Sequence, residues 1–263
     1  NSLMVKELNS IYHRLMNEYD RMYMLGEDIL DPYGGAFKVT KGLFTAFPER
    51  VLSSPISESA LVGIANGMAV RGLLPFVEIM FGDFVTLIVD QVVNYISKFN
   101  SMYNIKMKHA PIIRTPMGGY RGYGPTHSQT LEKLFFGVPG LLVISNDQIH
   151  NQHYIIKQII QSKMPCIYVE NKTVYGQRIF KYTNGMINNF YCQSTNSFFP
   201  STLLQIAPFQ DHFDLVLVTY GGMLNIALET AKKLFFEDEI IARIVLVSQL
   251  SPFPRADIIQ SIE

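Results

Sequence analysis

The sequence of 263 residues contains no tryptophan and only two cysteines, Cys166 and Cys192. Two cysteines are too few for a disulfide framework or a cysteine-rich metal site, and Cys166 lies in the apolar segment P-C-I-Y-V-E, as a reduced core residue would. Lysine plus arginine and aspartate plus glutamate each number 22, so the formal net charge is zero. This balance gives no support for nucleic acid or an anionic membrane as a partner.

Long hydrophobic runs are also missing. No uninterrupted apolar segment approaches the roughly 20 residues that a membrane-spanning helix needs. The N-terminal residues N-S-L-M-V-K-E-L carry polar and acidic side chains early and show no secretory pattern. We therefore expect no membrane association and a cytoplasmic location, with an organellar matrix as the alternative.

Several common catalytic motifs are absent as well. The glycine-rich segment 118–124 has neither the G-K-[ST] ending of a nucleotide P-loop nor the G-x-G-x-x-G spacing. His127 and Ser128 are adjacent but no G-x-S-x-G elbow exists, which argues against a serine hydrolase. His150 and His153 have the spacing of a metal-binding pair, but no third ligand is evident, and a solvated helix face is the expectation. We therefore assign no metal to this chain.

The sequence does contain a regular alternation of apolar strands and helical patterns. Strands are predicted at 22–25, 74–80, 111–115, 141–145 and 166–170, and helices at 3–19, 40–47, 57–72, 84–99, 131–136 and 149–161. This alternation predicts an α/β fold, a parallel sheet with helices on both faces. Active sites in such sheets lie beyond the carboxyl ends of the strands, where we expect the loops near Glu58, Met80 and Gly118.

The second part of the chain has a different pattern. Residues 1–176 form the first predicted domain, and residues 177–206 are polar, aromatic and aperiodic, which predicts an interdomain linker. In residues 207–263 one strand–helix–strand unit follows, and a last helical pattern begins. Because a single unit of about 55 residues cannot close a sheet, we expect this second domain to be incomplete.

The stretch P-I-S-E-S-A-L-V-G-I-A-N-G-M-A-V-R-G at 55–72 organises the first domain. Ser57 is a good helix N-cap, which places Glu58 in the first turn, where the helix dipole favours negative charge. Apolar residues at helical spacing, with Gly63 and Gly67 between them, predict a buried helix that another backbone approaches closely. Glu58 is then expected to point into a cleft, although an ordinary first-turn glutamate fits the same residues.

Several motifs in order resemble one family. They are P-I-S-E-S, V-E-I-M-F-G-D-F, I-V-D-Q-V-V-N, R-T-P-M-G-G-Y-R-G-Y-G-P-T-H-S-Q and Y-V-E-N-K, over residues 5–175. They are similar to the β subunit of thiamine-diphosphate-dependent 2-oxo acid dehydrogenases, the decarboxylating component of the pyruvate and branched-chain complexes. V-T-Y-G-G and S-P-F-P resemble the family's C-terminal transketolase-type domain. The implied fold is a pyrimidine-binding domain plus an incomplete C-terminal domain.

The resemblance implies roles for particular residues. Glu58 would hydrogen-bond the aminopyrimidine ring of thiamine diphosphate and take part in activating this cofactor. Ile56 would contact the same ring, Met80 would pack alongside it, and Phe84 would stack on it. His127 would contact the substrate or intermediate and assist transfer to the lipoyl group, since an imidazole can both donate and accept a proton. The expected catalytic residues are therefore Glu58 and His127.

One motif of the family is missing. Thiamine enzymes bind Mg²⁺ and the diphosphate at a G-D-G motif, and Gly82-Asp83-Phe84 lacks its second glycine. The resemblance therefore implies an α subunit that holds the Mg²⁺, in a heterotetramer of two α and two β chains that serves a lipoyl acyltransferase core. The expected reaction is oxidative decarboxylation of a small 2-oxo acid with acyl transfer to lipoamide. Another thiamine-dependent acyl transfer or carboligation, as with acetoin, and a non-catalytic subunit of the same fold are the alternatives.

Overall fold

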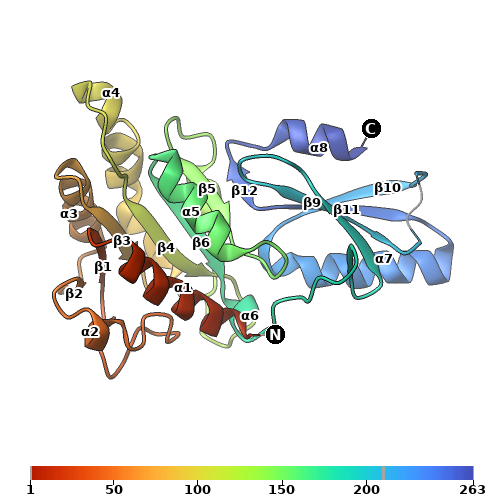
Figure 1. The fold of residues 1–263 in the computed structure, drawn as a ribbon, viewed down its shortest axis with the longest axis horizontal. Helices are drawn as coiled ribbons and strands as arrows, with labels where there is room; N and C mark the ends of the chain where they lie inside the picture. Colours follow the sequence, from red (N-terminus) through yellow and green to blue (C-terminus); the bar gives the residue numbers. More distant parts are fainter. Residues whose placement is uncertain (1, 209–210, 263) are drawn as a thin grey trace.

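The computed structural model describes residues 2–208 and 211–262, which form two β-sheets with helices packed against them (Figure 1). The first sheet has seven strands and the second has five. We call the parts built around them the N-terminal unit and the C-terminal unit. Among the described residues, no helix combines the length and apolar character needed to cross a membrane.

The seven-stranded sheet has the order β12-β5-β6-β4-β3-β1-β2. Its strands are β1 (Met22–Gly26), β2 (Val51–Ser53), β3 (Leu74–Glu78), β4 (Ile112–Met117), β5 (Leu142–Ser145), β6 (Cys166–Asn171) and β12 (Gln249–Ser251). Neighbours among β1 to β6 are parallel, and β12 joins β5 in the antiparallel direction. The predicted α/β fold with a parallel sheet is confirmed.

Helices cover both faces of this sheet. They are α1 (Met4–Glu18), α2 (Leu43–Ala46), α3 (Glu58–Val70), the 3-10 helix η1 (Gly82–Ile88), the π-helix η2 (Gln91–Ile96), α4 (Phe99–Tyr103), the 3-10 helix η3 (Glu132–Phe135), α5 (Gln152–Ser162) and α6 (Lys172–Tyr175). Helices α1 and α5 share a buried apolar cluster with Phe76 and Ile112. Helices α3, η1 and η2 share another with Val77 and Ile113. Alternate residues of one strand therefore enter opposite cores, as the pleat requires.

The single helix predicted at 84–99 is wrong, because this segment divides into η1, η2 and the start of α4. Its buried side chains nevertheless recur every fourth residue, at Ile88, Val92 and Ile96. Over so few residues, 3-10, α and π turns can all place such a stripe against a sheet. The pattern therefore predicts which face is buried but not the type of helix.

Asp31 caps the short helix α2. Its Oδ1 accepts a hydrogen bond from the Gly42 backbone N–H at 2.7 Å, and its Oδ2 accepts from the N–H and the hydroxyl of Thr45 at 2.9 and 2.7 Å. Burial alone would raise the pKa of Asp31, but these hydrogen bonds outweigh it and hold the pKa below its usual value. Asp31 therefore has a structural role, fixing the start of α2.

The C-terminal unit corrects the predicted linker. Its strands and helices are β7 (Met186–Ile187), β8 (Phe190–Ser194), β9 (Ser201–Ile206), β10 (Leu215–Thr219), the 3-10 helix η4 (Gly221–Met223), α7 (Leu224–Asp238), β11 (Ala242–Val247) and α8 (Arg255–Ile262). The sheet order is β10-β11-β9-β8-β7, so three strands from residues 177–206 belong to this sheet. Strand β9, S-T-L-L-Q-I, is buried throughout although half of it is polar. Those polar side chains concealed the strand in the hydrophobic pattern.

The two units are joined closely. Strand β12 follows the C-terminal sheet in sequence but pairs with β5 of the N-terminal sheet. Gly222, just before α7, meets α6 at close range: an added Cβ would lie 2.6 Å from Oγ1 of Thr173 and 2.7 Å from Cγ of Asn171. Only glycine allows this approach, so the turn before α7 is fixed against the carboxyl edge of the first sheet.

Candidate active site

The carboxyl ends of the parallel strands lie at one edge of the N-terminal sheet. Glu27 follows β1, Phe81 lies shortly after β3, His127 is on the loop after β4, and Lys172 follows β6. Glu58 begins α3 after β2. The structure therefore gathers several reactive side chains at the edge where the sequence predicts the site.

His127 lies among aromatic rings. Its ring centroid is 4.6 Å from that of Phe81 and 5.4 Å from that of Phe84, and both contacts are edge-to-face. Tyr123, on the same loop, lies 5.7 Å from Phe81. Nδ1 of His127 is 2.9 Å from the hydroxyl of Thr126. Two of the predicted site residues, Phe84 and His127, are thus in contact.

Lys172 holds the His127 loop through a hydrogen bond to its backbone. This lysine is completely buried, and its Nζ donates a hydrogen bond to the backbone carbonyl of His127. Nζ also lies 4.9 Å from the ring centroid of Phe81 and 5.6 Å from that of Tyr123, both within cation–π range. Burial lowers the pKa of Lys172, and the carboxylate of Asp83 partly opposes this shift. The ammonium group therefore connects the loop to the end of β6.

Asp83 holds the same loop on the other side of His127. Its Oδ1 accepts a hydrogen bond from Nε2 of Gln129 at 2.8 Å, and its Oδ2 accepts from the Gln129 N–H at 3.4 Å. Gly118 begins the loop with a φ of 103°, which favours glycine. The aspartate of the incomplete G-D-G string thus positions the loop that carries the histidine.

Glu58 is 6% exposed at the first position of α3. Ser57 occupies the N-cap position, but the predicted side-chain cap is wrong: instead its backbone N–H donates to Oε1 of Glu27 at 3.0 Å. Burial raises the pKa of Glu27, the bond from Ser57 opposes this, and the charge of Glu58 adds to it, so the net shift is upward. In the part of the chain that the structure describes, the Glu58 carboxylate has no hydrogen-bond partner.

The other two predicted cofactor contacts, Met80 and Ile56, differ in how far this chain buries them. Met80 is half-buried between β3 and η1. Ile56 is 85% exposed at the entrance to α3. The structure therefore brings Phe84 to His127 but leaves Ile56 on the surface of this chain.

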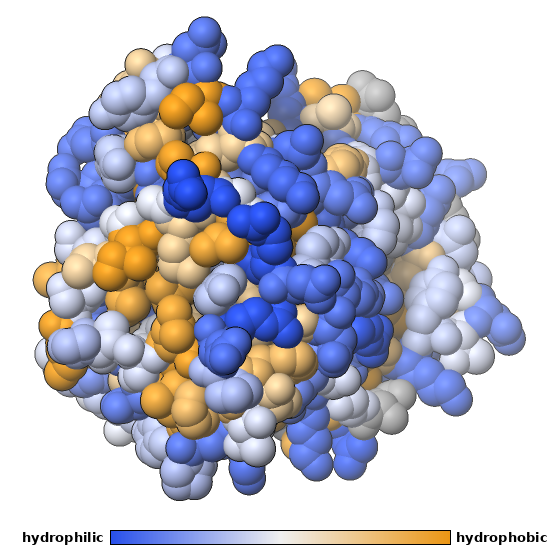
Figure 2. Space-filling model, turned by 60° about the vertical axis from the view of Figure 1, so that its left-hand side comes forward, coloured by the Kyte–Doolittle hydropathy of each residue, from blue (hydrophilic) through white to orange (hydrophobic). Residues whose placement is uncertain are grey.

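The sequence predicts that helix α3 is buried, but one of its faces is exposed in the structure. Ala65 is buried, but Ile64 is 55% exposed, and nothing lies within 4 Å of a Cβ added at Gly67. Leu87 of η1 is exposed as well. Figure 2 turns this side of the molecule forward and shows hydrophobic side chains gathered in patches on it. The face predicted to meet another backbone is thus open in this chain.

A buried ion network lies below the site. Arg114 on β4 pairs with Glu78 on β3 and with Glu170 on β6, and all three side chains are buried. The Nε of Arg114 donates to Glu170 at 2.8 Å, and its Nη2 donates to the hydroxyl of Tyr175 at 3.2 Å. Burial raises the pKa of Glu78, and Arg114 partly opposes this. The network fixes three neighbouring strands directly behind the loops of the site.

The two predicted helix-face histidines have separate partners. His150 is buried: its Nδ1 is 2.6 Å from Oδ2 of Asp147, and its Nε2 is 3.0 Å from the hydroxyl of Thr202. His153 lies 3.6 Å from Glu18. The expected solvated face is therefore wrong for His150. Within residues 2–208 and 211–262, no group of three or more His, Cys, Asp or Glu side chains is arranged to hold a metal.

The fold and this edge have counterparts in known proteins. Residues 3–177 match the family model described as transketolase, pyrimidine binding domain. The chain is 34% identical to the β subunit of acetoin:2,6-dichlorophenolindophenol oxidoreductase from Cupriavidus necator, over 97% of this chain and 74% of that protein. It is 30% identical to the mitochondrial pyruvate dehydrogenase E1 component subunit beta-1 of Arabidopsis thaliana, over 97% of this chain and 68% of that protein.

A solved structure has the same fold. A split-gene transketolase, an inactive beta4 tetramer, superimposes with a TM-score of 0.70 at 22% identity, covering 99% of this chain and 75% of that one. The chain therefore belongs to the family of β subunits of thiamine-diphosphate-dependent 2-oxo acid and acetoin dehydrogenases, which carry the transketolase pyrimidine-binding domain. This membership confirms the resemblance seen in the sequence motifs.

The sequence motifs did not single out three residues of the site: Glu27, Phe81 and Lys172. Each follows the carboxyl end of a predicted strand, and that position alone marks it as a candidate. Their contacts with Ser57, His127 and the aromatic rings depend on which strands are neighbours. The order of the strands in the sheet cannot be read from a local sequence pattern.

Proposed function

We propose that this chain is the β subunit of a dehydrogenase that decarboxylates a small 2-oxo acid oxidatively and transfers the acyl group to lipoamide, with thiamine diphosphate as cofactor. The observation that carries the proposal is the position of Glu58, 6% exposed and with an unpartnered carboxylate among the described residues, at the same sheet edge as the aromatic-lined His127. The relatives named above support the reaction type.

The described residues fit the aminopyrimidine half of the cofactor. Glu58 is 6% exposed and its carboxylate has no hydrogen-bond partner among the described residues, so it can accept a hydrogen bond from a ring N–H or amino group of a ligand. Phe84 offers an aromatic face, and Ile56 offers an exposed apolar side chain. Thiamine diphosphate, when bound, supplies the electron sink that decarboxylation of a 2-oxo acid requires.

The proposed roles of Glu58 and His127 are distinct. Glu58 holds a hydrogen bond or a proton at the ring nitrogen of the cofactor and so keeps it in its reactive form. His127 faces the substrate side, where its imidazole donates or accepts a proton during acyl transfer. Lys172 and Asp83 keep the His127 loop in place. The imidazole ring is therefore already positioned when the substrate binds, and the entropy cost of ordering it is not incurred at each turnover.

The other half of the site is proposed to come from an α subunit. Diphosphate with Mg²⁺ needs several hard oxygen ligands, and the described residues offer no cluster of them. The open apolar face of α3 supports a heterotetramer of two α and two β chains, since a partner would cover it. A lipoyl acyltransferase core is the proposed acceptor, and residues 1–176 are proposed as the pyrimidine domain. The proposed location is the cytoplasm or an organellar matrix, and some relatives are named mitochondrial.

An alternative candidate function is cleavage of acetoin by the same cofactor chemistry. The observation that favours it is the 34% identity to the acetoin-oxidising relative. Co-expression with the α subunit and assay of pyruvate, branched 2-oxo acids and acetoin separates the two. Turnover of acetoin alone would replace the first proposal.

Calorimetry tests the shared site. The chain alone should bind thiamine diphosphate with Mg²⁺ at about millimolar affinity or weaker, because only one hydrogen bond and a small apolar area are available. Adding the α subunit should restore tight binding. Glu58→Gln should weaken that binding or the reaction, whereas Glu49→Gln, at an exposed glutamate, should not. Micromolar binding without a partner would contradict the half-site.

A further inference from the structure

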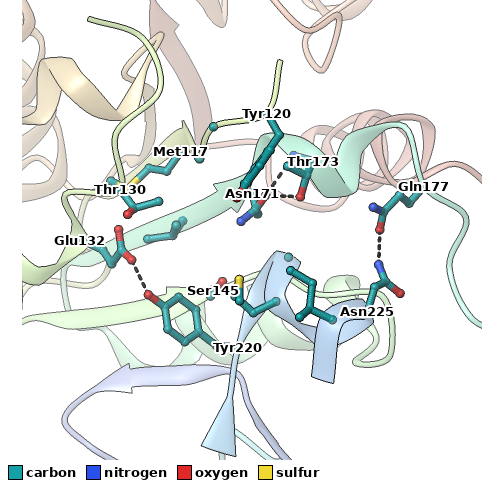
Figure 3. A pocket seen from close by; sticks show the side chains of 16 residues that line it. Met117, Tyr120, Thr130, Glu132, Ser145, Asn171, Thr173, Gln177, Tyr220 and Asn225 are labelled. Atoms are coloured by element: carbon teal, nitrogen blue, oxygen red, sulfur yellow. Dashed lines mark hydrogen bonds between the residues drawn. The ribbon is translucent and has the colours of Figure 1, made fainter. Parts of the chain in front are cut away.

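A cavity lies between the two units (Figure 3). Its volume is about 470 Å³. One wall is the beginning of the His127 loop at 118–120, and the opposite wall is the start of α7 with Tyr220 and Ile226. Neither Glu58, Phe84 nor His127 lines it, so it is separate from the proposed cofactor half-site.

One end of the cavity carries a carboxylate. Glu132 is 4% exposed, and its Oε1 accepts a hydrogen bond from the hydroxyl of Tyr220 at 2.5 Å. Its Oε2 is buried and has no partner among the described residues. No lysine, arginine or histidine of residues 2–208 and 211–262 forms an ion pair with it. A buried carboxylate oxygen is costly unless a donor reaches it, and a cation satisfies it best.

The other end carries amides, and Figure 3 places Gln177 and Asn225 there, opposite Glu132. Oε1 of Gln177 accepts from Nδ2 of Asn225 at 2.7 Å, which leaves the NH₂ group of Gln177 as a donor. Oδ1 of Asn171 accepts from Thr173, which likewise leaves the NH₂ group of Asn171. These two donors suit a carbonyl oxygen of a ligand.

The walls between the two ends are largely apolar. Met117, Val169, Met223 and Ile226 line them. A ligand that satisfies all three regions therefore has a cationic amine, an apolar middle and a carbonyl group. Small-molecule sites commonly have this composition, an apolar cavity with a few polar groups that orient the ligand.

We propose that this cavity binds a small, elongated organic amine with an amide-type carbonyl at its far end. The ammonium group binds Oε2 of Glu132, the carbonyl accepts from Asn171 and Gln177, and the chain between them packs on the apolar walls. Gly118 and Thr130 both line the cavity, on either side of His127 in sequence. An occupant therefore contacts both ends of the His127 loop and stabilises the loop in the position that the structure shows.

The probe is 6-aminohexanamide, and its matched control is hexanamide, which lacks only the ammonium group. Binding to the full chain is followed by ligand-observed NMR, without cofactor or substrate, so failure of the proposed function would not affect the result. We expect the amine to bind about 10-fold more tightly than hexanamide, as for one charge-assisted hydrogen bond. It should also slow tryptic cleavage after Arg121 in the loop.

Variants locate the binding. Glu132→Gln should remove the preference for the amine, whereas Glu237→Gln, at an exposed glutamate near the end of α7, should keep it. Ile226→Lys changes a half-exposed wall residue, so the fold should tolerate it, and its own ammonium should displace the probe. Three results would overturn the proposal. One is equal binding of both probes, and another is an unchanged preference for the amine in Glu132→Gln. The third is no binding of either probe at tens of millimolar, a concentration about ten times the Kd expected for so small a ligand.

Discussion

Replacing Lys172 by methionine should release the His127 loop while leaving the rest of the chain folded. Lys172 is fully buried and donates to the His127 carbonyl, with two aromatic rings within cation–π range. A hydrogen bond to a charged group contributes about 1.5–3 kcal/mol net. Methionine keeps the length and the apolar packing of the lysine stem, so the charge-assisted contact is the main loss.

This loss sets the size of the effect. A change of about 1.4 kcal/mol alters an equilibrium constant tenfold. Losing about 1.5–3 kcal/mol of stabilisation should therefore raise the population of the open loop roughly 10- to 150-fold. Trypsin reports it directly, because Arg121 lies exposed in the loop and cleavage follows the population of the open form when opening is fast. Cleavage after Lys233, inside α7, reports unfolding of the C-terminal unit and should change little.

Two further variants complete the test. Lys172→Arg should restore part of the protection, since a guanidinium also donates to a carbonyl. Lys181→Met, at an exposed lysine, should behave as the unmodified chain. The reasoning is refuted if Lys172→Met leaves cleavage after Arg121 unchanged, or if it raises cleavage at both sites by the same factor.

Three other predictions follow from the site and its support. In the complex with an α subunit, Glu58→Gln should slow hydrogen–deuterium exchange at the thiazolium carbon of the cofactor. His127→Ala should spare that exchange and reduce turnover by about 100-fold or more, so equal slowing of exchange would contradict the division of roles. Glu170→Leu leaves Arg114 with one buried partner fewer and should lower the free energy of unfolding by about 3–5 kcal/mol in urea titrations; a change under about 1 kcal/mol would argue against the network. Asp31→Ala should cost about 1 kcal/mol at pH 7, as for a helix cap. Because hydrogen bonds outweigh burial and hold the pKa of Asp31 below its usual value, this stabilisation is present above the unfolded-state pKa and is lost as the pH falls through the folded-state pKa. A stability difference that does not shrink as the pH is lowered through the acid range would contradict it.

Much of the fold could be predicted because its signals are local. Strands β3 and β6 each begin with a run of four apolar residues, and α1 has an apolar stripe at helical spacing, so each segment indicates its own structure. The positions of Glu58 at the start of a helix and of His127 on a glycine-rich loop also follow from short stretches of sequence. These features need no knowledge of distant residues.

Other features depend on contacts between segments far apart in the sequence. Strand β9 looked like linker because its polar residues Ser201, Thr202 and Gln205 are buried only when β8 and β11 pair with it. Helix α3 looked buried because its composition suits close contact, but among the described residues nothing lies within 4 Å of a Cβ added at Gly67, and Ile64 is 55% exposed.

The site itself was decided in the same way. Lys172 meets His127 because β6 lies beside β4, although 45 residues separate them. Glu27 meets Ser57 because β1 lies beside β2. By itself, the sequence determined which segments form strands and helices and which reactive residues follow them, since hydrophobic periodicity and turn chemistry act over a few residues. Only the tertiary structure decided which of those residues meet, because burial and charge pairing depend on the order in which the strands assemble.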